Sequence, residues 1–163
     1  MSKPEAVRLI PCGIEHAPVV ATLLSVCFDD PWSPKEVREI IAMPGGFGIL
    51  ADEGDGPVGY ILIHAAVDEA SVLSIGVIAA CRRRGIAGHL LAAGERRSAE
   101  LGAEMIFLEV AAADDGACAF YQVAGYVEVG RRANYYQRRI GERVDALLLR
   151  RTLFDDIFNT GMF

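Results

Sequence analysis

The spacing of apolar residues changes several times along the chain, and each change predicts a new element of secondary structure. Apolar positions in 14–28 recur every three or four residues, which is typical of an amphipathic helix. Residues 58–67 and 71–78 are instead rich in Val, Ile and Leu, as strands are. The same patterns along the whole chain predict strands at 6–10, 47–51, 58–67, 71–78, 105–110, 126–130 and 145–153, and helices at 14–28, 34–43, 85–101 and 115–124.

Residues suited to helix ends support these boundaries. Ser33 is a good N-cap, Pro34 fits the first helical position, and Glu36 can complete a capping box. Asp114 or Asp115 can cap the helix that follows. The stretch DEGDG at 52–56 has the turn chemistry of a hairpin between two strands.

The predicted elements follow the order β-α-α-β-β-β-α-β-α-β-β. Strand–helix–strand units beside hairpins imply an α/β fold of the α+β type, in which a mixed sheet of about seven strands carries four helices on both faces. The sequence contains no internal repeat and no linker long enough to divide domains. We therefore expect a single domain over 1–153, followed by a tail over 154–163 that shows no clear pattern.

Composition and charge narrow the class of protein. With 52% hydrophobic and 23% charged residues, the chain has an ordinary globular composition. No uncharged apolar run approaches the roughly 20 residues that span a bilayer, and the first ten residues lack the apolar core of a signal peptide, so a cytoplasmic protein is expected. A net charge of −6 argues against direct nucleic-acid binding and suits a cationic partner, such as an amine or a basic peptide.

The cysteines and histidines give no sign of a metal site. The four cysteines form no CxxC pair, and the three histidines are isolated from them. We interpret the cysteines as small apolar residues in a reducing compartment.

The stretch RRRGIAGHLL, at 82–91, places positive charge where a helix is predicted to begin. Cations normally favour the opposite end of a helix. A strand, a tight turn and a helix start leave backbone N–H groups free, and these donors can bind an anion such as phosphate. Gly85 would allow a ligand close to the backbone, and the arginines could bond phosphate oxygens. No P-loop or dinucleotide motif is present, and a solvated basic loop is the alternative.

This stretch also resembles a known family signature. R82-R83-R84-G85-I86-A87 is similar to the R/Q-x-x-G-x-G/A loop of the GNAT acetyltransferases, and the stretch from 70 to 136 resembles the RimI branch of that family. The supporting motifs are PWS at 31–33, LEV at 108–110, FYQVAGY at 120–126 and NYY at 134–136.

The resemblance implies a GNAT fold, acetyl-CoA as cofactor, and acetyl transfer to the N-terminal alanine of a small-subunit ribosomal protein. A lysine side chain or a small-molecule amine are alternative acceptors, and a non-catalytic acyl-CoA-binding module is a further alternative. The sequence leaves the oligomeric state open.

The resemblance also implies which residues bind the cofactor. Backbone N–H groups near 76–78 would polarise the thioester carbonyl, and the arginine–glycine loop would hold the pyrophosphate. The implied residues are Ile75, Gly76, Val77, Ile78, Arg82, Arg83, Arg84, Gly85, Ile86, Ala87, Gly88, Asp114, Ala117 and Tyr121. The sequence departs from the RimI pattern at Asp114, where an asparagine is usual, and at Ala111, where an arginine is usual.

Glu109 and Tyr121 are the candidate catalytic pair. Strand alternation places Glu109 on one face with Met105 and Phe107, where a carboxylate is costly unless it is satisfied, so it is either a strand-end residue that reaches water or a general base. Tyr121 is either a core aromatic or a general acid, since a phenol of pKa about 10 is protonated at neutral pH. The resemblance implies the base and acid roles.

Five further residues are candidates for binding the acceptor. Asn134, Tyr135 and Tyr136 follow the predicted sixth strand and form either a polar aromatic turn or part of the acceptor groove. Trp32 could cover the core or wall the substrate site. Glu69 could attract a basic peptide or be an ordinary hairpin charge.

Overall fold

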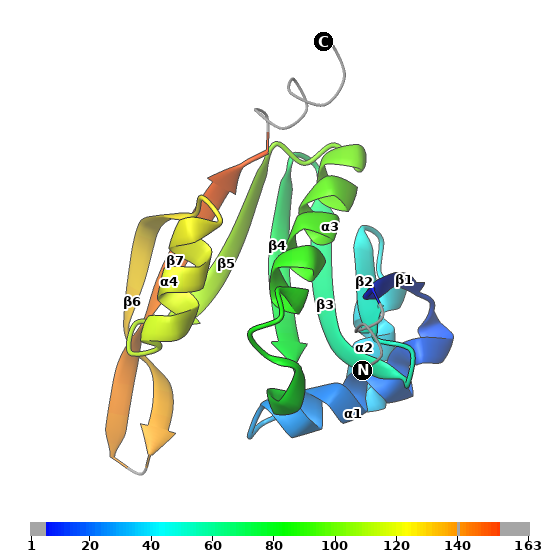
Figure 1. Cartoon of the computed structure of the whole chain (residues 1–163). Coiled ribbons are helices and arrows are strands. Elements are labelled where there is room, and N and C mark those ends of the chain that lie inside the picture. The colour runs from blue at the N-terminus through cyan, green and yellow to red at the C-terminus, as the bar shows by residue number, and fades with distance from the viewer. Residues whose placement is uncertain (1–5, 140, 154–163) are drawn as a thin grey trace.

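A computed structural model describes residues 6–139 and 141–153, and within them the predicted order of strands and helices is confirmed (Figure 1). The strands are β1 (Arg8–Cys12), β2 (Gly46–Asp52), β3 (Pro57–Ala66), β4 (Glu69–Val77), β5 (Met105–Ala111), β6 (Val127–Arg139) and β7 (Glu142–Thr152). The α-helices are α1 (Ala17–Cys27), α2 (Pro34–Ala42), α3 (Ile86–Glu100) and α4 (Asp115–Val123), with short 3-10 helices η1 (Ile14–His16) and η2 (Ala79–Cys81).

The seven strands form one mixed sheet in the order β1-β2-β3-β4-β5-β7-β6. All neighbours are antiparallel except β4 and β5, whose parallel pairing runs only from Glu69 and Met105 to Ser71 and Phe107. Beyond these pairs the two strands diverge, as Figure 1 shows. We call the facing edges of 72–77 on β4 and 108–111 on β5 the divergent edge. Its backbone groups have no partner strand opposite them, so a ligand can bond them.

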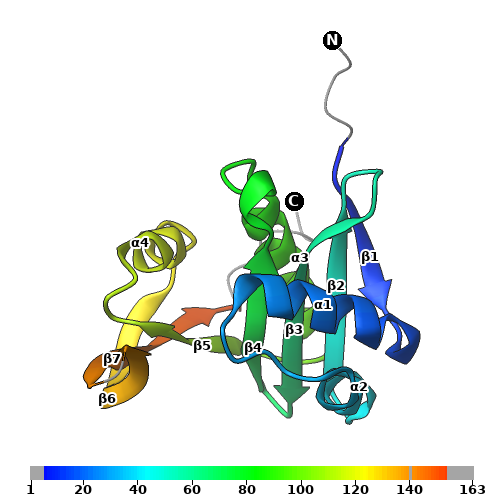
Figure 2. The same ribbon diagram turned by 90° about the horizontal axis from the view of Figure 1, so that it is seen from below.

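Alternation along the central strands divides the core into two clusters. Ile49, Ile61 and Ile63 face α3 and α4, whereas Leu50, Tyr60 and Leu62 face α1 and α2. Figure 2 shows α3 and α4 on one side of the sheet and α2 on the other. The expected placement of helices on both faces is therefore confirmed.

Among the described strands, β2, β3 and β4 have helices packed on both faces. The buried residues packed with α1 and α2 come from those helices, β2 and β3, so β5 is left open on that side. Along β5, Ile106, Leu108 and Val110 are buried, while Met105, Phe107, Glu109 and Ala111 are only half-buried. Glu109 therefore shares a face with Met105 and Phe107, as strand alternation predicted, and this face is only half-buried because no helix among the described residues covers it.

The helix caps are as predicted. The Glu36 backbone N–H donates to Ser33 Oγ at 3.2 Å, and the Ala117 N–H donates to Asp114 Oδ1 at 3.0 Å.

No helix in the described part of the chain is long and apolar enough to cross a membrane.

The last hairpin is where the predicted boundaries are furthest from the structure. β6 continues to Arg139 instead of ending at 130, and β7 begins at Glu142 instead of 145. Pairing with β7 extends β6 through a charged stretch that has no strand-like alternation. Asn134, Tyr135 and Tyr136 consequently lie inside β6, and not after it. The first strand is also shifted, to 8–12, and the predicted tail lies outside the described residues.

Candidate active site

The end of β4 is packed so closely that only glycine fits at position 76. A Cβ there would lie 2.9 Å from a ring carbon of Tyr60 and 3.1 Å from Cys27 Sγ. Tyr60 cannot move aside easily, because it is fully buried and its hydroxyl is 2.7 Å from Ser74 Oγ. Burial also raises the pKa of the Tyr60 phenol. Gly76 therefore holds β4 close to the α1 side of the sheet.

The amides between 76 and 78 do not all face the divergent edge. Ile78 N–H donates to Val58 O at 2.9 Å and is therefore already bonded to β3, contrary to the expectation that it polarises a ligand carbonyl. Amide groups point alternately to the two sides of a strand, so the Gly76 N–H also points to β3. The N–H groups of Ile75 and Val77 point the other way, to the divergent edge. The Val77 carbonyl on that edge accepts a bond from Arg82 Nε at 3.0 Å. Val77 N–H is thus the donor best placed for a thioester oxygen.

Two of the three consecutive arginines have partners inside the protein. Arg82 bonds Val77, and Arg84 pairs with Glu53 at 2.9 Å. Arg83 has a left-handed backbone, with φ 64°, and its exposed side chain makes no hydrogen bond or ion pair with any described residue. Arg83 is therefore the guanidinium left for an external anion.

The start of α3 fits a phosphate-bearing ligand. The first intrahelical bond runs from His89 N–H to Gly85 O, so the amides of Ile86, Ala87 and Gly88 have no acceptor within the helix. Gly85 has φ 78°, which favours glycine, and a Cβ at Gly85 or Gly88 would meet nothing within 4 Å. This open backbone, with Arg83 beside it, can hold the pyrophosphate of acetyl-CoA, while the divergent edge can receive its thioester arm.

Glu109 lies on the open face of β5 and is paired with an arginine. Its Oε1 is 3.2 Å from Arg132 Nη2, and 27% of its side chain is exposed. The sheet register explains the contact. Arg132 and Ala111 are both paired with Ala146, so their side chains project from the same face of the sheet. Glu109 is two residues before Ala111 on the same strand and therefore projects from that face as well. The carboxylate can accept a proton from an amine only where this guanidinium leaves it accessible.

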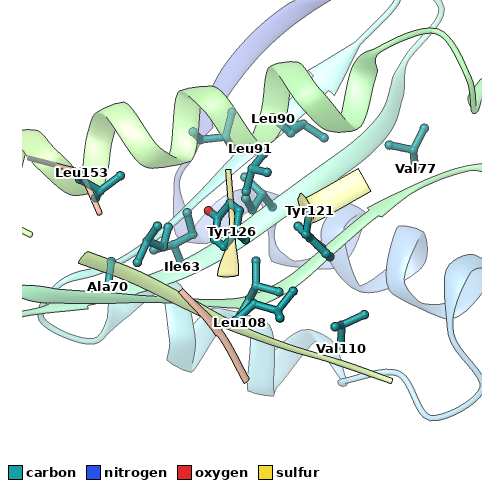
Figure 3. Close-up of a cluster of buried hydrophobic side chains, with 14 of the residues drawn as sticks. Ile63, Ala70, Val77, Leu90, Leu91, Leu108, Val110, Tyr121, Tyr126 and Leu153 are labelled. Atoms are coloured by element: carbon teal, nitrogen blue, oxygen red, sulfur yellow. The ribbon is translucent and has the colours of Figure 1, made fainter. Parts of the chain in front are cut away.

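Tyr121, on α4, lies on the opposite face. It belongs to the buried cluster that also contains Leu91 of α3 and Leu108 of β5 (Figure 3), and it is 8% exposed. Burial, together with the charge of Asp114, raises the pKa of its phenol to about 12. The hydroxyl is therefore protonated at neutral pH and can act as a proton donor.

Tyr121 packs against Tyr126, which belongs to a buried polar network. The rings of Tyr121 and Tyr126 are in edge contact at 5.7 Å, and Tyr126 donates its hydroxyl to Glu95 Oε2 at 2.9 Å. Glu95 also pairs with Arg151 at 3.0 Å. Since Glu95 is on α3 and Arg151 on β7, this network joins the two sides of the divergent edge.

Glu109 and Tyr121 can meet only across the divergent edge. The neighbours of Glu109 along the strand, Leu108 and Val110, share the buried cluster of Tyr121, so Glu109 points to the other face. A ligand in the divergent edge would have a carboxylate on one side and a phenol on the other.

The three predicted acceptor residues on β6 form a bulge. Residues 133–135 stand opposite the single β7 residue Asp145, and Asn134 adopts a left-handed φ of 56°. Asp145 holds the bulge, because Oδ1 accepts the Asn134 N–H at 3.0 Å and Oδ2 pairs with Arg131 at 3.1 Å. These two bonds lower the pKa of Asp145.

The bulge places Tyr135 beside Arg132, the partner of Glu109, with 5.2 Å between the guanidinium carbon and the ring centroid. Burial and the charge of Glu109 raise the pKa of Tyr136, and the Tyr135 ring is in edge contact with Tyr136 at 5.1 Å. Strands that form bulges often redirect side chains next to active sites.

The other two acceptor candidates lie elsewhere. Trp32 packs, half-buried, against the α1–α2 cluster, as the core-covering alternative requires. Glu69 opens β4 opposite Met105, at the end of the strand remote from Gly76. Glu69 and Gly76 are roughly 20 Å apart along the strand. The structure therefore does not bring Glu69 to the catalytic pair.

Sequence reasoning missed Arg132, Asp145 and Glu95. Each gains its partner from a strand or helix distant in the chain, so no local spacing identifies it. The only available signal was the charge of the residues immediately before NYY.

Comparisons with known proteins agree with this geometry. The model of the acetyltransferase (GNAT) family matches residues 17–126. The chain is 34% identical over 113 residues to N-alpha-acetyltransferase RimI of Mycobacterium tuberculosis (strain ATCC 25618 / H37Rv), which covers 67% of this chain and 70% of that protein.

Two solved structures share the fold. The ribosomal-protein-S18-alanine N-acetyltransferase from Escherichia coli superposes with a TM-score of 0.83 at 21% identity, covering 91% of this chain and 94% of that chain. Arabidopsis thaliana NAA60, solved in complex with acetyl-CoA, superposes with a TM-score of 0.78 at 15% identity, covering 90% and 98%. Because the family model spans more than half of the chain, this protein belongs to the GNAT family and is an acetyl-CoA-dependent N-acetyltransferase.

Proposed function

We propose that this enzyme acetylates the N-terminal alanine of a small-subunit ribosomal protein in the cytoplasm. The observation that carries the proposal is the 34% identity to a protein named N-alpha-acetyltransferase RimI. The likeness in fold to the alanine N-acetyltransferase of ribosomal protein S18 is consistent with it. A free, basic peptide N-terminus would also suit a protein of net charge −6.

In this proposal, residues of β4 and the start of α3 bind the cofactor. Bound acetyl-CoA supplies an acetyl thioester. The amides of Ala87 and Gly88, with Arg83, hold its phosphates, and Val77 N–H bonds the carbonyl oxygen. Gly76 keeps the β4 backbone in place for that bond.

Proton transfer falls to the two side chains on opposite faces. Glu109 takes a proton from the acceptor ammonium, directly or through a water, which leaves a neutral amine able to attack. The amine nitrogen bonds to the thioester carbon and the carbon–sulfur bond breaks, while Tyr121 gives its proton to the departing sulfur, since the neutral phenol is the form present at physiological pH. The nitrogen then loses its extra proton to solvent, and the phenol recovers a proton from solvent. Tyr135 and Tyr136 flank the acceptor where it approaches Glu109.

The chemistry of the acceptor favours an α-amine over a lysine. An α-amino group has a pKa near 7.7–8.0, against about 10.4 for lysine. Deprotonation of lysine would therefore cost roughly 3.5 kcal/mol more at the same pH. A carboxylate base on a half-exposed face is sufficient for the easier of the two substrates.

Two peptides test the proposal. Both are basic. One has a free N-terminal alanine, and the other is blocked at its N-terminus and contains internal lysines. We expect turnover of the free-alanine peptide alone, and a fall in kcat of about 10²- to 10⁴-fold in Glu109→Gln.

Glu100→Gln is the matched control. Glu100 pairs with Arg97 at 3.2 Å on the surface of α3, the same distance as in the Glu109–Arg132 pair. Its kcat should equal that of the wild type. Turnover of the lysine peptide would redirect the proposal to side-chain acetylation, and turnover of neither peptide by an enzyme that binds CoA would refute a peptide substrate.

A further inference from the structure

The carboxylate proposed to deprotonate the acceptor is already occupied by a cation. Arg132 Nη2 lies 3.2 Å from Glu109 Oε1. The two side chains are unequally exposed, at 62% for Arg132 and 27% for Glu109. The carboxylate is thus comparatively fixed at the floor of the site, whereas the guanidinium is free to move into solvent.

The guanidinium has a second partner besides Glu109. Arg132 lies over the ring of Tyr135, with 5.2 Å between the guanidinium carbon and the ring centroid. A cation over an aromatic face is stabilised by the ring quadrupole, and this contact does not need Glu109. Arg132 can therefore leave the carboxylate and keep a favourable partner.

The bulge keeps this partner in reach. Asp145 accepts the Asn134 N–H and pairs with Arg131, so the backbone that carries Arg132 and Tyr135 is held at both ends of the bulge. Tyr136, whose pKa the charge of Glu109 raises, closes the same cluster. The cluster consists of one carboxylate, one movable cation and two aromatic rings.

An acceptor ammonium needs the same carboxylate that Arg132 holds. We propose that Arg132 is a specificity-determining residue, which pairs with Glu109 in the free enzyme and is displaced from it by the cationic amine of the acceptor while keeping its contact with Tyr135. The inference rests on the proposed function, because it takes the acceptor to be an amine that binds at Glu109. Neutral molecules of the same shape gain nothing from the carboxylate and leave the guanidinium in place.

The competition should be modest in size. Ion pairs with one largely exposed partner contribute little to stability, so the acceptor loses only part of its affinity in displacing one. Removal of the guanidinium should tighten binding of the acceptor by about two- to fivefold.

Calorimetric binding of the two peptides to the full chain tests this directly. In Arg132→Gln, the Kd of the free-alanine peptide should fall about two- to fivefold, and Arg132→Lys should restore the wild-type value. The peptide blocked at its N-terminus should have the same Kd for the wild type, Arg132→Gln and Arg132→Lys.

Arg97→Gln is the matched control, because Arg97 forms a surface pair of the same length on α3 and should leave the peptide Kd unchanged. An unchanged or higher Kd in Arg132→Gln overturns the inference, as does tightening of the blocked peptide to the same degree. Since binding is read without turnover, an enzyme that binds the free-alanine peptide but does not acetylate it refutes the proposed function and still decides the role of Arg132.

Discussion

The two parts of the sheet on either side of the divergent edge are built in different ways. Strands β2–β4 are covered on both faces, by α1 and α2 on one and α3 on the other, and β4 presents mainly backbone to the divergent edge. Strands β5–β7 are covered by α4 on one face only, and they present side chains, from Glu109 to the bulge tyrosines.

This difference suits the two ligands of an acetyltransferase. A cofactor common to the whole family can be bound by amides and glycines, whose positions depend on the rigid packing around them. An acceptor that differs between enzymes is better bound by side chains on an open face, where substitutions cost little stability. Substitutions in the first part should therefore affect folding and cofactor binding, and those in the second should affect chemistry and acceptor choice.

The largest effect is expected from Tyr121→Phe. Removal of the hydroxyl should lower kcat about 10²- to 10⁴-fold, because the departing sulfur loses its proton donor. The ring stays in contact with Tyr126, so the free energy of unfolding should change by less than about 1 kcal/mol. Steady-state kinetics and urea unfolding measure the two quantities. A loss of stability as large as the loss of activity would show that Tyr121 is a packing residue.

The raised pKa of Tyr121 predicts a pH dependence of stability. Burial favours the neutral phenol, whose pKa rises from 10.0 to about 12. Its contribution is complete below about pH 10 and is lost as the pH rises through 12, because the unfolded chain then releases the proton more readily. Between these values the wild type should lose stability faster with pH than Tyr121→Phe. Equal slopes in the two proteins would argue that the phenol is not buried in solution.

Glu95→Ala tests the network that joins the two parts. The substitution removes the acceptor of Tyr126 and one partner of Arg151, and loss of a buried ionic partner typically costs about 3–5 kcal/mol. Urea unfolding measures the cost. Glu100→Ala on the exposed side of the same helix is the control and should cost less than about 1 kcal/mol. Equal costs in the two variants would mean that the network does not hold the two parts together.

Gly76→Ala and Gly88→Ala apply the same change to two glycines of the first part. At Gly76 the new methyl group would meet the buried Tyr60 ring at 2.9 Å, which should destabilise the fold by about 1–3 kcal/mol. At Gly88 it would meet nothing within 4 Å, and alanine should stabilise the helix by about 0.5–1 kcal/mol while raising the KM for acetyl-CoA. Thermal unfolding distinguishes the two, and effects of the same sign on stability would contradict the packing described for β4.

The smallest effect is expected from Asp145→Asn. The side chain keeps its shape but loses the charge that pairs with Arg131, so the bulge should loosen. The KM of the acceptor peptide should rise about two- to fivefold, with the KM for acetyl-CoA unchanged. A change in the KM for acetyl-CoA instead would show that the second part of the sheet also shapes the cofactor site.

Local sequence patterns predicted most of the fold. Periodicity located all four helices, and the caps at Ser33 and Asp114 were as expected, because the hydrogen bonds of a cap join residues only three positions apart. The glycine-rich start of α3 was also visible, since a left-handed glycine before a helix is a local feature. The catalytic roles of Glu109 and Tyr121 remain predictions.

Long-range pairing explains where sequence reasoning was wrong. The ladder with β7 determines the length of β6, and the bulge opposite Asp145 determines where the tyrosines point. Glu69 and Glu109 look alike as strand carboxylates, but Glu69 lies in the short parallel ladder, opposite Met105, whereas Glu109 lies beyond that ladder, where β4 and β5 diverge.

The sequence by itself determined the elements, their order and the family to which the chain is similar, because these depend on periodicity, caps and contiguous motifs. Only the tertiary structure decided that Arg82 and Arg84 are engaged within the protein, that Arg132 holds Glu109, and that Glu95 joins α3 to β7. Arg82 reaches a backbone carbonyl, and the other three contacts join charged side chains from segments far apart in the chain. Their choice of partner depends on distances that exist only once the sheet has assembled.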